Sequence, residues 1–380
     1  MFKINVFLSV LYYLATMIVG IFTYKYLWGN VSDHALKYWM ILFEFSIVLM
    51  LMDFGFTQKF LKNNLYGDGS IKESLSDLRI TLVIYGFILI SILFFYIYFN
   101  GVYEYIDVFS LVLICLSFFF NFISYAETAN LKYSNSLLRI NFAQMGGLLF
   151  YVLIIFNLDL DFILNVSLAM FFRSLLLYLI QIKNFSIKFN YILRPDFDAV
   201  KLNFSYFMFF SIDLVVFEAI GLSLFSMVVL GLYLKYFNII RGGVDVINNY
   251  VFLRLNNINY IGIYYALLVV GYLLLGFICN YILGLYFDDF KGVEYLPLLI
   301  SINFLAIGIY RLKSNIIYYK NPKVNFTSII IKVLAVKLVF FVSYMLLGDY
   351  FISYIIQFIL ITLLIYNILI VEKSSKNCGN

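Results

Sequence analysis

Apolar residues fill long, continuous blocks of this chain instead of alternating with polar ones. One block begins at Thr81, and no charged residue lies between Arg79 and Glu104. A helix needs about 20 mostly apolar residues to cross a hydrocarbon core about 30 Å thick, whereas barrel strands alternate over about 10 residues. Lipid offers no partner for backbone N–H and C=O groups, so these continuous blocks predict membrane-spanning helices.

About twelve blocks are long enough to span a membrane. The predicted spans are 5–27, 38–60, 80–99, 107–126, 138–157, 162–182, 204–221, 226–248, 259–283, 293–312, 325–347 and 350–371. The first block is longer than the apolar part of a secretory leader and has no convincing small-residue cleavage site, so we expect a retained span. The predicted fold class is an all-α polytopic membrane protein with about twelve transmembrane helices.

Composition agrees with this prediction. Of 380 residues, 64% are apolar and 12% are charged, whereas a soluble domain carries about 25% charged residues. Two of the three cysteines, Cys115 and Cys279, fall inside predicted spans, so no disulfide framework is indicated. The net charge of +5 follows from membrane topology and needs no nucleic-acid partner.

The basic residues predict the orientation of the chain. With the N-terminus in the cytoplasm, most of the 26 Lys and Arg residues lie in cytoplasmic loops, tails or span ends. Only Lys25, Lys37 and Lys291 lie on the outer side. This asymmetry follows the positive-inside rule, so we expect an inner-membrane-type protein with both termini in the cytoplasm.

The connection between spans 6 and 7 is basic and divides the chain into two halves. We expect an N-terminal six-helix lobe at 1–183, a cytoplasmic linker at 184–203 and a C-terminal six-helix lobe with a short tail at 204–380. An even number of spans makes both halves enter from the same side. The sequence therefore permits two parallel lobes facing each other across a central cavity, as in transporters with parallel repeats.

Ionisable residues inside the predicted spans are the candidate functional groups, because each costs about 2.5–3.5 kcal/mol to insert. Three cations lie near mid-depth: Arg173, Lys235 and Lys337. They outnumber the charges of Glu44, Asp213 and Glu218 if one of these three acids is protonated. A surplus of positive charge favours a phosphate or pyrophosphate group, and Arg139 at an inner span end could meet a lipid head group. Four acids could carry a coupling proton or sodium ion, because burial raises a carboxylate pKa: Glu44, Asp53, Asp213 and Glu218.

Each candidate also has a structural explanation. Asp213 and Lys235 lie at similar depth on consecutive predicted helices and could form an ion pair. An interfacial position toward the inner end of span 38–60 would explain Asp53, and Arg139 fits the positive-inside rule. Lys332 could extend to the cytoplasmic interface.

Motifs of soluble enzymes are absent from the sequence. It contains no G-x-x-x-x-G-K-[ST] phosphate loop and only one histidine, His34. We therefore expect no cofactor and no metal site. Asp288 and Asp289 resemble acidic metal sites of membrane glycosyltransferases, but a hydrated outer loop explains them too.

Three loose motifs occur along the chain. The first runs from Gly29 and Tyr38 to Asp53-Phe54-Gly55-Phe56, with Lys59 and Lys62 after it. The others are Asp213 with Gly231 and Tyr233, and Ile282-Leu283-Gly284 with Gly292 and Tyr295. Together they resemble the polysaccharide flippases, which export O-antigen and capsule units and belong to the multidrug/oligosaccharidyl-lipid/polysaccharide superfamily; Phe54 stands where that family usually has leucine. The resemblance covers essentially the whole chain.

This resemblance implies a flippase that moves an undecaprenyl-pyrophosphate-linked oligosaccharide to the outer leaflet by alternating access, coupled to an ion gradient. Its partners are the lipid-linked oligosaccharide, membrane lipid, and a proton or sodium ion. The alternative from the enzyme class is a polysaccharide polymerase or lipid-linked glycosyltransferase, although the large outer loop of such polymerases is missing. A drug or ion antiporter of the same superfamily is a third possibility, which the aromatic content of 21% favours and the surplus positive charge opposes.

Overall fold

The structure, a computed structural model, describes most of the N-terminal half and four helical stretches further on. The described residues are 2–27, 30–66, 74–134, 136–158, 160–182, 192–210, 213, 216, 230, 231, 234, 270, 281, 296–320 and 326–377. These residues form helices joined by short connections, with no strand among them. The chain divides into a first unit, Met1–Asn203, and a second unit, Phe204–Asn380.

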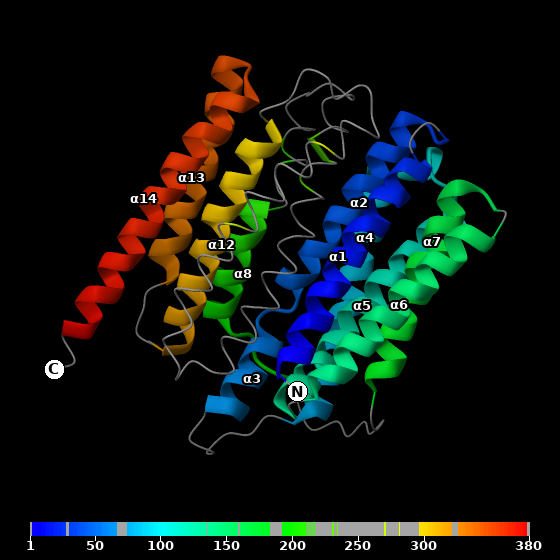
Figure 1. Cartoon of the computed structure of the whole chain (residues 1–380), viewed down its shortest axis with the longest axis horizontal. Helices are drawn as coiled ribbons and strands as arrows, with labels where there is room; N and C mark the ends of the chain where they lie inside the picture. Colours follow the sequence, from blue (N-terminus) through cyan, green and yellow to red (C-terminus); the bar gives the residue numbers. More distant parts are fainter. Residues whose placement is uncertain are drawn as a thin grey trace. The chain divides into compact units, whose positions relative to one another are not determined.

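The described part of the first unit contains seven helices before α8 (Figure 1). Its elements are α1 (Phe2–Leu27), α2 (Asp33–Met52), α3 (Phe56–Tyr66), α4 (Leu75–Phe99), α5 (Val108–Tyr133), α6 (Leu137–Asn157) and α7 (Phe162–Gln181), with a 3-10 turn at Val102–Glu104. Helix α5 packs against α4 and α7, and α6 packs against α7 and α1. Helix α3 is short and amphipathic and lies against α5 and α4.

Side-chain caps begin several of these helices. Ser74 accepts a hydrogen bond from the backbone N–H of Asp77 at the start of α4, and Asp107 does the same for Ser110 in α5. Asp161 accepts from two backbone N–H groups at the start of α7. Such caps satisfy N–H groups that have no partner inside the helix, so the polar residues between the apolar blocks define where the helices begin.

The second unit contains α12 (Leu296–Lys320), α13 (Phe326–Leu347) and α14 (Tyr350–Asn377), and α14 packs against both others. Helix α8 (Phe197–Phe210) begins within the first unit and ends within the second. In the second unit the Phe209 and Tyr310 rings meet edge to face at 5.4 Å, which joins α8 to α12. Gly348 ends α13 with a φ of 66°, and its N–H donates to the carbonyl of Tyr344.

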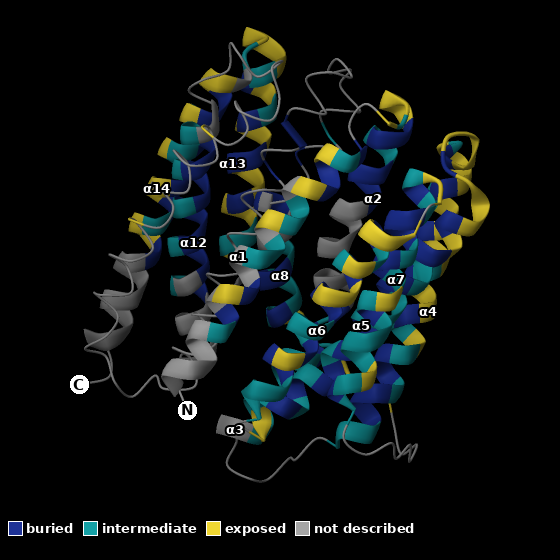
Figure 2. Cartoon of the chain, turned by 45° about the vertical axis from the view of Figure 1, so that its right-hand side comes forward, coloured by how far each residue is buried: buried dark blue, intermediate teal, exposed yellow. Residues whose placement is uncertain are grey.

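Six of the described helices are long and apolar enough to cross a membrane: α4, α5, α6, α7, α13 and α14. Large apolar side chains on them are exposed, among them Phe94 at 63% and Leu338 at 65% (Figure 2). Exposed apolar surface of this extent on long helices matches lipid, not water. The chain is therefore an all-α, multi-pass membrane protein, which confirms the predicted fold class at this level.

Several predicted boundaries need correction. Span 38–60 is not one helix: α2 begins at Asp33 and ends at Met52, and α3 starts after a turn. Phe54 and Gly55 have φ of 45° and 73° in that turn, a conformation that a right-handed helix excludes. Helix α5 continues past the predicted end at 126, and α8 begins at Phe197 inside the predicted linker 184–203. The predicted spans 226–248 and 259–283 lie almost entirely outside the described residues.

Candidate functional site

One face of α1 carries a row of polar side chains, which we call the polar seam. Ser9, Tyr12, Thr23 and Tyr26 are separated by three or by eleven residues, spacings that keep them on one side of a helix. Each of them bonds to a side chain of α6 or α7. The seam thus carries hydrogen-bonding groups along most of the length of α1.

The contacts of the seam pair its residues with polar positions inside predicted spans. Ser9 donates to Asn141 Oδ1 at 2.7 Å, and the hydroxyls of Thr23 and Tyr151 are 3.1 Å apart. At the far end, Asn165 Nδ2 donates to the Tyr26 hydroxyl at 3.0 Å and also to two carbonyls that end α6, those of Ile155 and Leu158. Buried polar groups with partners of this kind keep the helices in one register.

Arg173 joins the seam at its centre. It lies near the middle of α7, and its Nη2 donates to the Tyr12 hydroxyl at 2.6 Å. Its guanidinium carbon lies 5.9 Å from the centre of the Tyr151 ring, and Gly147 on α6 leaves room for its backbone and Cγ. Arg173 is partly exposed. The Tyr12 hydroxyl is a neutral partner, and the guanidinium itself stays protonated in proteins.

The second unit contains a buried charge cluster at mid-span. Lys337 Nζ donates to Asp213 Oδ1 at 2.5 Å, and both side chains are almost completely buried. The Tyr354 hydroxyl donates to the other carboxylate oxygen of Asp213 at 3.2 Å. Asp213 was predicted to pair with Lys235 if its role were structural; the structure pairs it with Lys337 on α13, and Lys235 lies outside the described residues.

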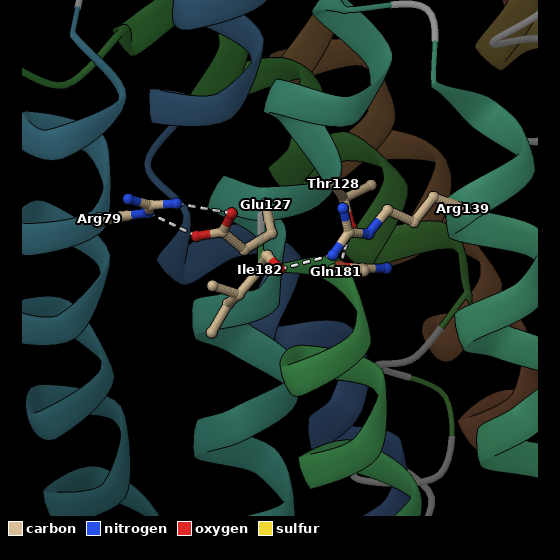
Figure 3. A network of polar contacts seen from close by, with 6 residues as sticks. All are labelled: Arg79, Glu127, Thr128, Arg139, Gln181 and Ile182. Atoms are coloured by element: carbon tan, nitrogen blue, oxygen red, sulfur yellow. Dashed lines mark hydrogen bonds and ion pairs between the residues drawn. The ribbon is translucent and has the colours of Figure 1, made fainter. Parts of the chain in front are cut away.

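At one end of the first unit, four helices share a polar layer (Figure 3). Arg79 near the start of α4 donates two hydrogen bonds to the Glu127 carboxylate of α5, at 2.5 and 2.9 Å, and both side chains are buried. Next to Glu127, Thr128 donates to Gln181 Oε1 at 3.0 Å. This end is the one predicted to face the cytoplasm.

Arg139 belongs to the same layer. Its Nε and Nη2 donate to the carbonyls of Ile180 and Ile182 at 2.7 and 2.6 Å, where α7 ends. The last carbonyls of a helix lack partners within it, and a cation there also complements the helix dipole. The contacts give Arg139 a structural role at the end of α7, while its predicted role in binding a head group remains a prediction.

Asp53 occupies the turn that separates α2 from α3, outside both helices. Its carboxylate accepts from the Thr57 hydroxyl at 2.6 Å and from the Thr57 N–H at 3.3 Å, so it caps α3. The side chain is buried, and this burial raises the pKa of Asp53 to about 7, although the bonds from Thr57 act in the opposite direction. A carboxyl group with a pKa in this range can gain or lose a proton near neutral pH.

The turn at Asp53 is docked onto the segment that precedes α8. The N–H of Asp196 donates to the carbonyl of Phe54 at 3.1 Å, and Lys59 Nζ donates to the carbonyl of Arg194 at 3.1 Å. The N–H of Leu193 donates to the Thr81 hydroxyl of α4 at 3.0 Å. These three bonds fix residues 192–196 on the first unit.

The predicted site residues are therefore divided among several places. Arg173 belongs to the polar seam, Arg139 to the end layer and Asp53 to the turn before α3, all within the first unit, whereas Asp213 and Lys337 meet within the second. Lys235 and Glu218 lie outside the described residues, as does the side chain of Glu44. Within the described part of the chain, no group of three His, Cys, Asp or Glu side chains could hold a metal ion.

Sequence reasoning missed the Arg79–Glu127 pair and the seam. Arg79 and Glu127 fall just outside the predicted spans 80–99 and 107–126, so a search for ionisable residues inside the spans did not include them. The polar residues of α1 carry no charge, so a search for charges passed over them. Their helical spacing within an otherwise apolar block was the signal that could have found the seam.

Comparisons with known proteins add no family assignment: no family model matches this chain, and no curated protein matches its sequence.

Proposed function

We propose that this protein is a flippase that translocates undecaprenyl-pyrophosphate-linked oligosaccharide repeat units across the bacterial inner membrane by alternating access. In this proposal it is a transporter and not an enzyme. About twelve spans form two six-helix lobes around a central cavity, and both termini lie in the cytoplasm. The proposal combines the sequence motifs with the polar groups that the structure places inside the first unit.

Arg173 is the observation that carries the proposal. A guanidinium in the middle of a membrane-spanning helix is costly, and here it is bonded to a phenol on a row of polar side chains. A guanidinium stays protonated and its planar fork matches phosphate oxygens, so it suits the pyrophosphate of a lipid-linked sugar. The neighbouring hydroxyl and amide groups of the seam suit the polar sugar that follows.

The other candidate cations contribute differently. Lys337 has Asp213 as its counter-ion, so it adds no net charge to a binding surface in this arrangement. The proposal assigns the pyrophosphate to Arg173 and Lys235, and the head group of lipid arriving from the cytoplasm to Arg139.

Ion coupling, by a proton or by sodium, is the second part of the proposal. Its candidates are Glu44, Asp53, Asp213 and Glu218. Asp53 is the described acid best suited to a proton, because its raised pKa lies near neutral pH and its turn contacts the segment that leads into α8. A change in the charge of Asp53 therefore acts on the turn between α2 and α3, which is bonded to the segment that precedes α8.

A leaflet-transfer assay tests the proposal. The full-length protein is reconstituted into vesicles that hold a labelled undecaprenyl-pyrophosphate oligosaccharide in one leaflet, and the label exposed in the other leaflet is followed with time. We expect protein-dependent transfer without any change in oligosaccharide length. Transfer no faster than in protein-free vesicles contradicts the flippase, and lengthening of the sugar chain supports the polymerase alternative instead.

A further inference from the structure

Lys337 lies in the middle of a buried cage within the second unit. We define the Lys337 cage as the Asp213 carboxylate, the Tyr354 hydroxyl bonded to that carboxylate, and the rings of Phe209, Phe340 and Phe341. The ammonium lies 4.8 Å from the centre of the Phe340 ring, 5.8 Å from that of Phe341 and 6.0 Å from that of Phe209. Aromatic faces attract cations within about 6 Å, so the carboxylate and the three rings all favour a positive charge at one point.

The cage is held in place by the helices that contribute to it. Phe209 belongs to α8, Phe340 and Phe341 to α13, and Tyr354 to α14. On α12, Asn303 donates to the backbone carbonyl of Tyr354 at 3.0 Å and accepts from Gln357 at 3.2 Å. Asp213 and Lys337 are each about 1% exposed. The cage is thus a preformed and buried environment around the Lys337 ammonium.

This chemistry does not require the cation to be a lysine. A carboxylate, a hydroxyl and aromatic faces recognise an ammonium, a potassium ion or a sodium ion by the same electrostatics, and oxygen ligands suit alkali cations. What distinguishes Lys337 is that its cation is covalently attached to α13. A free cation would have to displace the ammonium from its carboxylate in a medium where a separated charge is expensive.

We propose that the Lys337 cage is a monovalent-cation site whose cation is the protein's own ammonium group. Removal of the lysine side chain opens the site to a free monovalent cation, and in the native protein the site is already filled. The inference concerns the second unit alone and holds whatever the protein transports. In the flippase proposed above, an exchangeable coupling ion would then bind at an acid other than Asp213.

Lys337→Ala tests the proposal, because it removes three methylene groups and the ammonium, which together correspond to n-propylammonium. The purified full-length variant is unfolded thermally in detergent with increasing n-propylammonium, sodium or potassium chloride, and the double variant described below is measured at the same concentrations to correct for ionic strength. We expect n-propylammonium to raise the unfolding midpoint saturably by at least about 3 °C. The wild-type midpoint should not respond, because its site is filled.

Two controls separate a cation site from a simple cavity. The uncharged analogue 1-propanol fills the same volume, and the double variant Asp213→Asn/Lys337→Ala lacks the carboxylate. We expect neither 1-propanol in the single variant nor n-propylammonium in the double variant to raise the midpoint. Equal rescue by 1-propanol, equal rescue in the double variant, or no rescue by any cation in a folded Lys337→Ala protein each overturns the proposal.

A second variant applies if Lys337→Ala cannot be recovered folded. Asp213→Asn/Lys337→Met replaces the ion pair with two neutral side chains of similar volume. The proposal predicts that this variant is recovered folded, because the carboxylate without a cation is what prevents folding of the single variant. If the neutral double variant also fails to fold, the fold requires the exact packing of Asp213 and Lys337 and not a cation beside the carboxylate, which contradicts the proposal.

Discussion

The two units place their buried ion pairs at different depths and use different cations. In the first unit, Arg79 and Glu127 pair where α4 begins and α5 approaches its end. In the second, Lys337 and Asp213 pair near the middle of α13. An arginine keeps its proton and binds a carboxylate through two parallel bonds, whereas lysine is a compact point charge that responds to burial.

The two ion pairs have different structural surroundings and different roles. The Arg79–Glu127 pair belongs to a layer of polar contacts that joins the ends of α4, α5, α6 and α7 (Figure 3). The Lys337 pair is surrounded by aromatic rings in the apolar interior, where an ion without its partner is costly. The Arg79–Glu127 pair thus holds helix ends together, and the Lys337–Asp213 pair fills a cage.

The largest effect should come from breaking the first-unit pair. Glu127→Gln leaves the buried Arg79 guanidinium without its counter-ion, and removal of one partner from a buried pair costs about 3–5 kcal/mol. The free energy of unfolding in mixed micelles measures this loss. Arg79→Met/Glu127→Leu should recover most of it, and a double variant as unstable as Glu127→Gln would contradict a charge-based explanation.

A turn in each unit allows a matched test of packing. Gly55→Ala in the first unit introduces a Cβ at a φ of 73°, only 2.5 Å from the Cβ of Ala199. Gly348→Ala in the second unit has a similar φ of 66° but no atom within 4 Å of the new Cβ. We expect unfolding free-energy losses of about 3 and about 1 kcal/mol, respectively, because only the first adds a clash to the backbone strain. Equal losses would show that the contact with Ala199 has no energetic role.

Two adjacent glycines test how tightly Arg173 is seated. A Cβ at Gly147 would lie 3.1 Å from the Arg173 carbonyl oxygen, whereas one at Gly146 would lie 3.7 Å from the flexible tip of Ile180. Gly147→Ala should lower the unfolding free energy by about 1 kcal/mol more than Gly146→Ala, because backbone yields less than a side-chain tip. The same measurement in micelles compares them, and a larger loss for Gly146→Ala would refute this account of the α6–α7 contact.

The smallest effect is expected at the exposed pair of α8. Lys201 Nζ lies 3.3 Å from Asp198 Oδ1, with both side chains substantially exposed. Exposed pairs contribute about 0–1 kcal/mol, so Asp198→Asn should change the unfolding free energy by less than about 0.5 kcal/mol. A loss approaching that of Glu127→Gln would mean that burial does not decide which ion pairs matter in this protein.

The sequence predicted some helices closely. The predicted span 162–182 corresponds to α7, and 325–347 corresponds to α13 within about a residue at each end. Hydrophobicity did not show the break at Phe54 and Gly55, because the apolar residues Phe56 and Phe60 continue beyond it, and the turn contacts Asp196, which is far away in sequence. The spacing of apolar residues predicts helices, whereas a contact between residues far apart in the sequence depends on tertiary structure.

The same limit applies to the candidate site. Depth within the predicted spans singled out Asp213 and Lys337, which are buried in the structure, but depth alone could not show which helices are neighbours. Asp213 was matched with Lys235 on the next predicted helix, and the structure instead brings Lys337 to it from α13. Tyr12, the partner of Arg173, is far away in sequence and uncharged, so no pattern linked the two.

The most direct test of the account is the role of Arg173 in leaflet transfer. In the vesicle assay, Arg173→Gln should slow transfer of the pyrophosphate-linked oligosaccharide roughly 10- to 100-fold, as expected when a charge-assisted bond worth about 1.5–3 kcal/mol is lost. Arg173→Lys keeps the charge and should retain part of the rate, with Asp198→Asn as a control at wild-type rate. Wild-type transfer by an equal amount of folded Arg173→Gln protein would contradict the account.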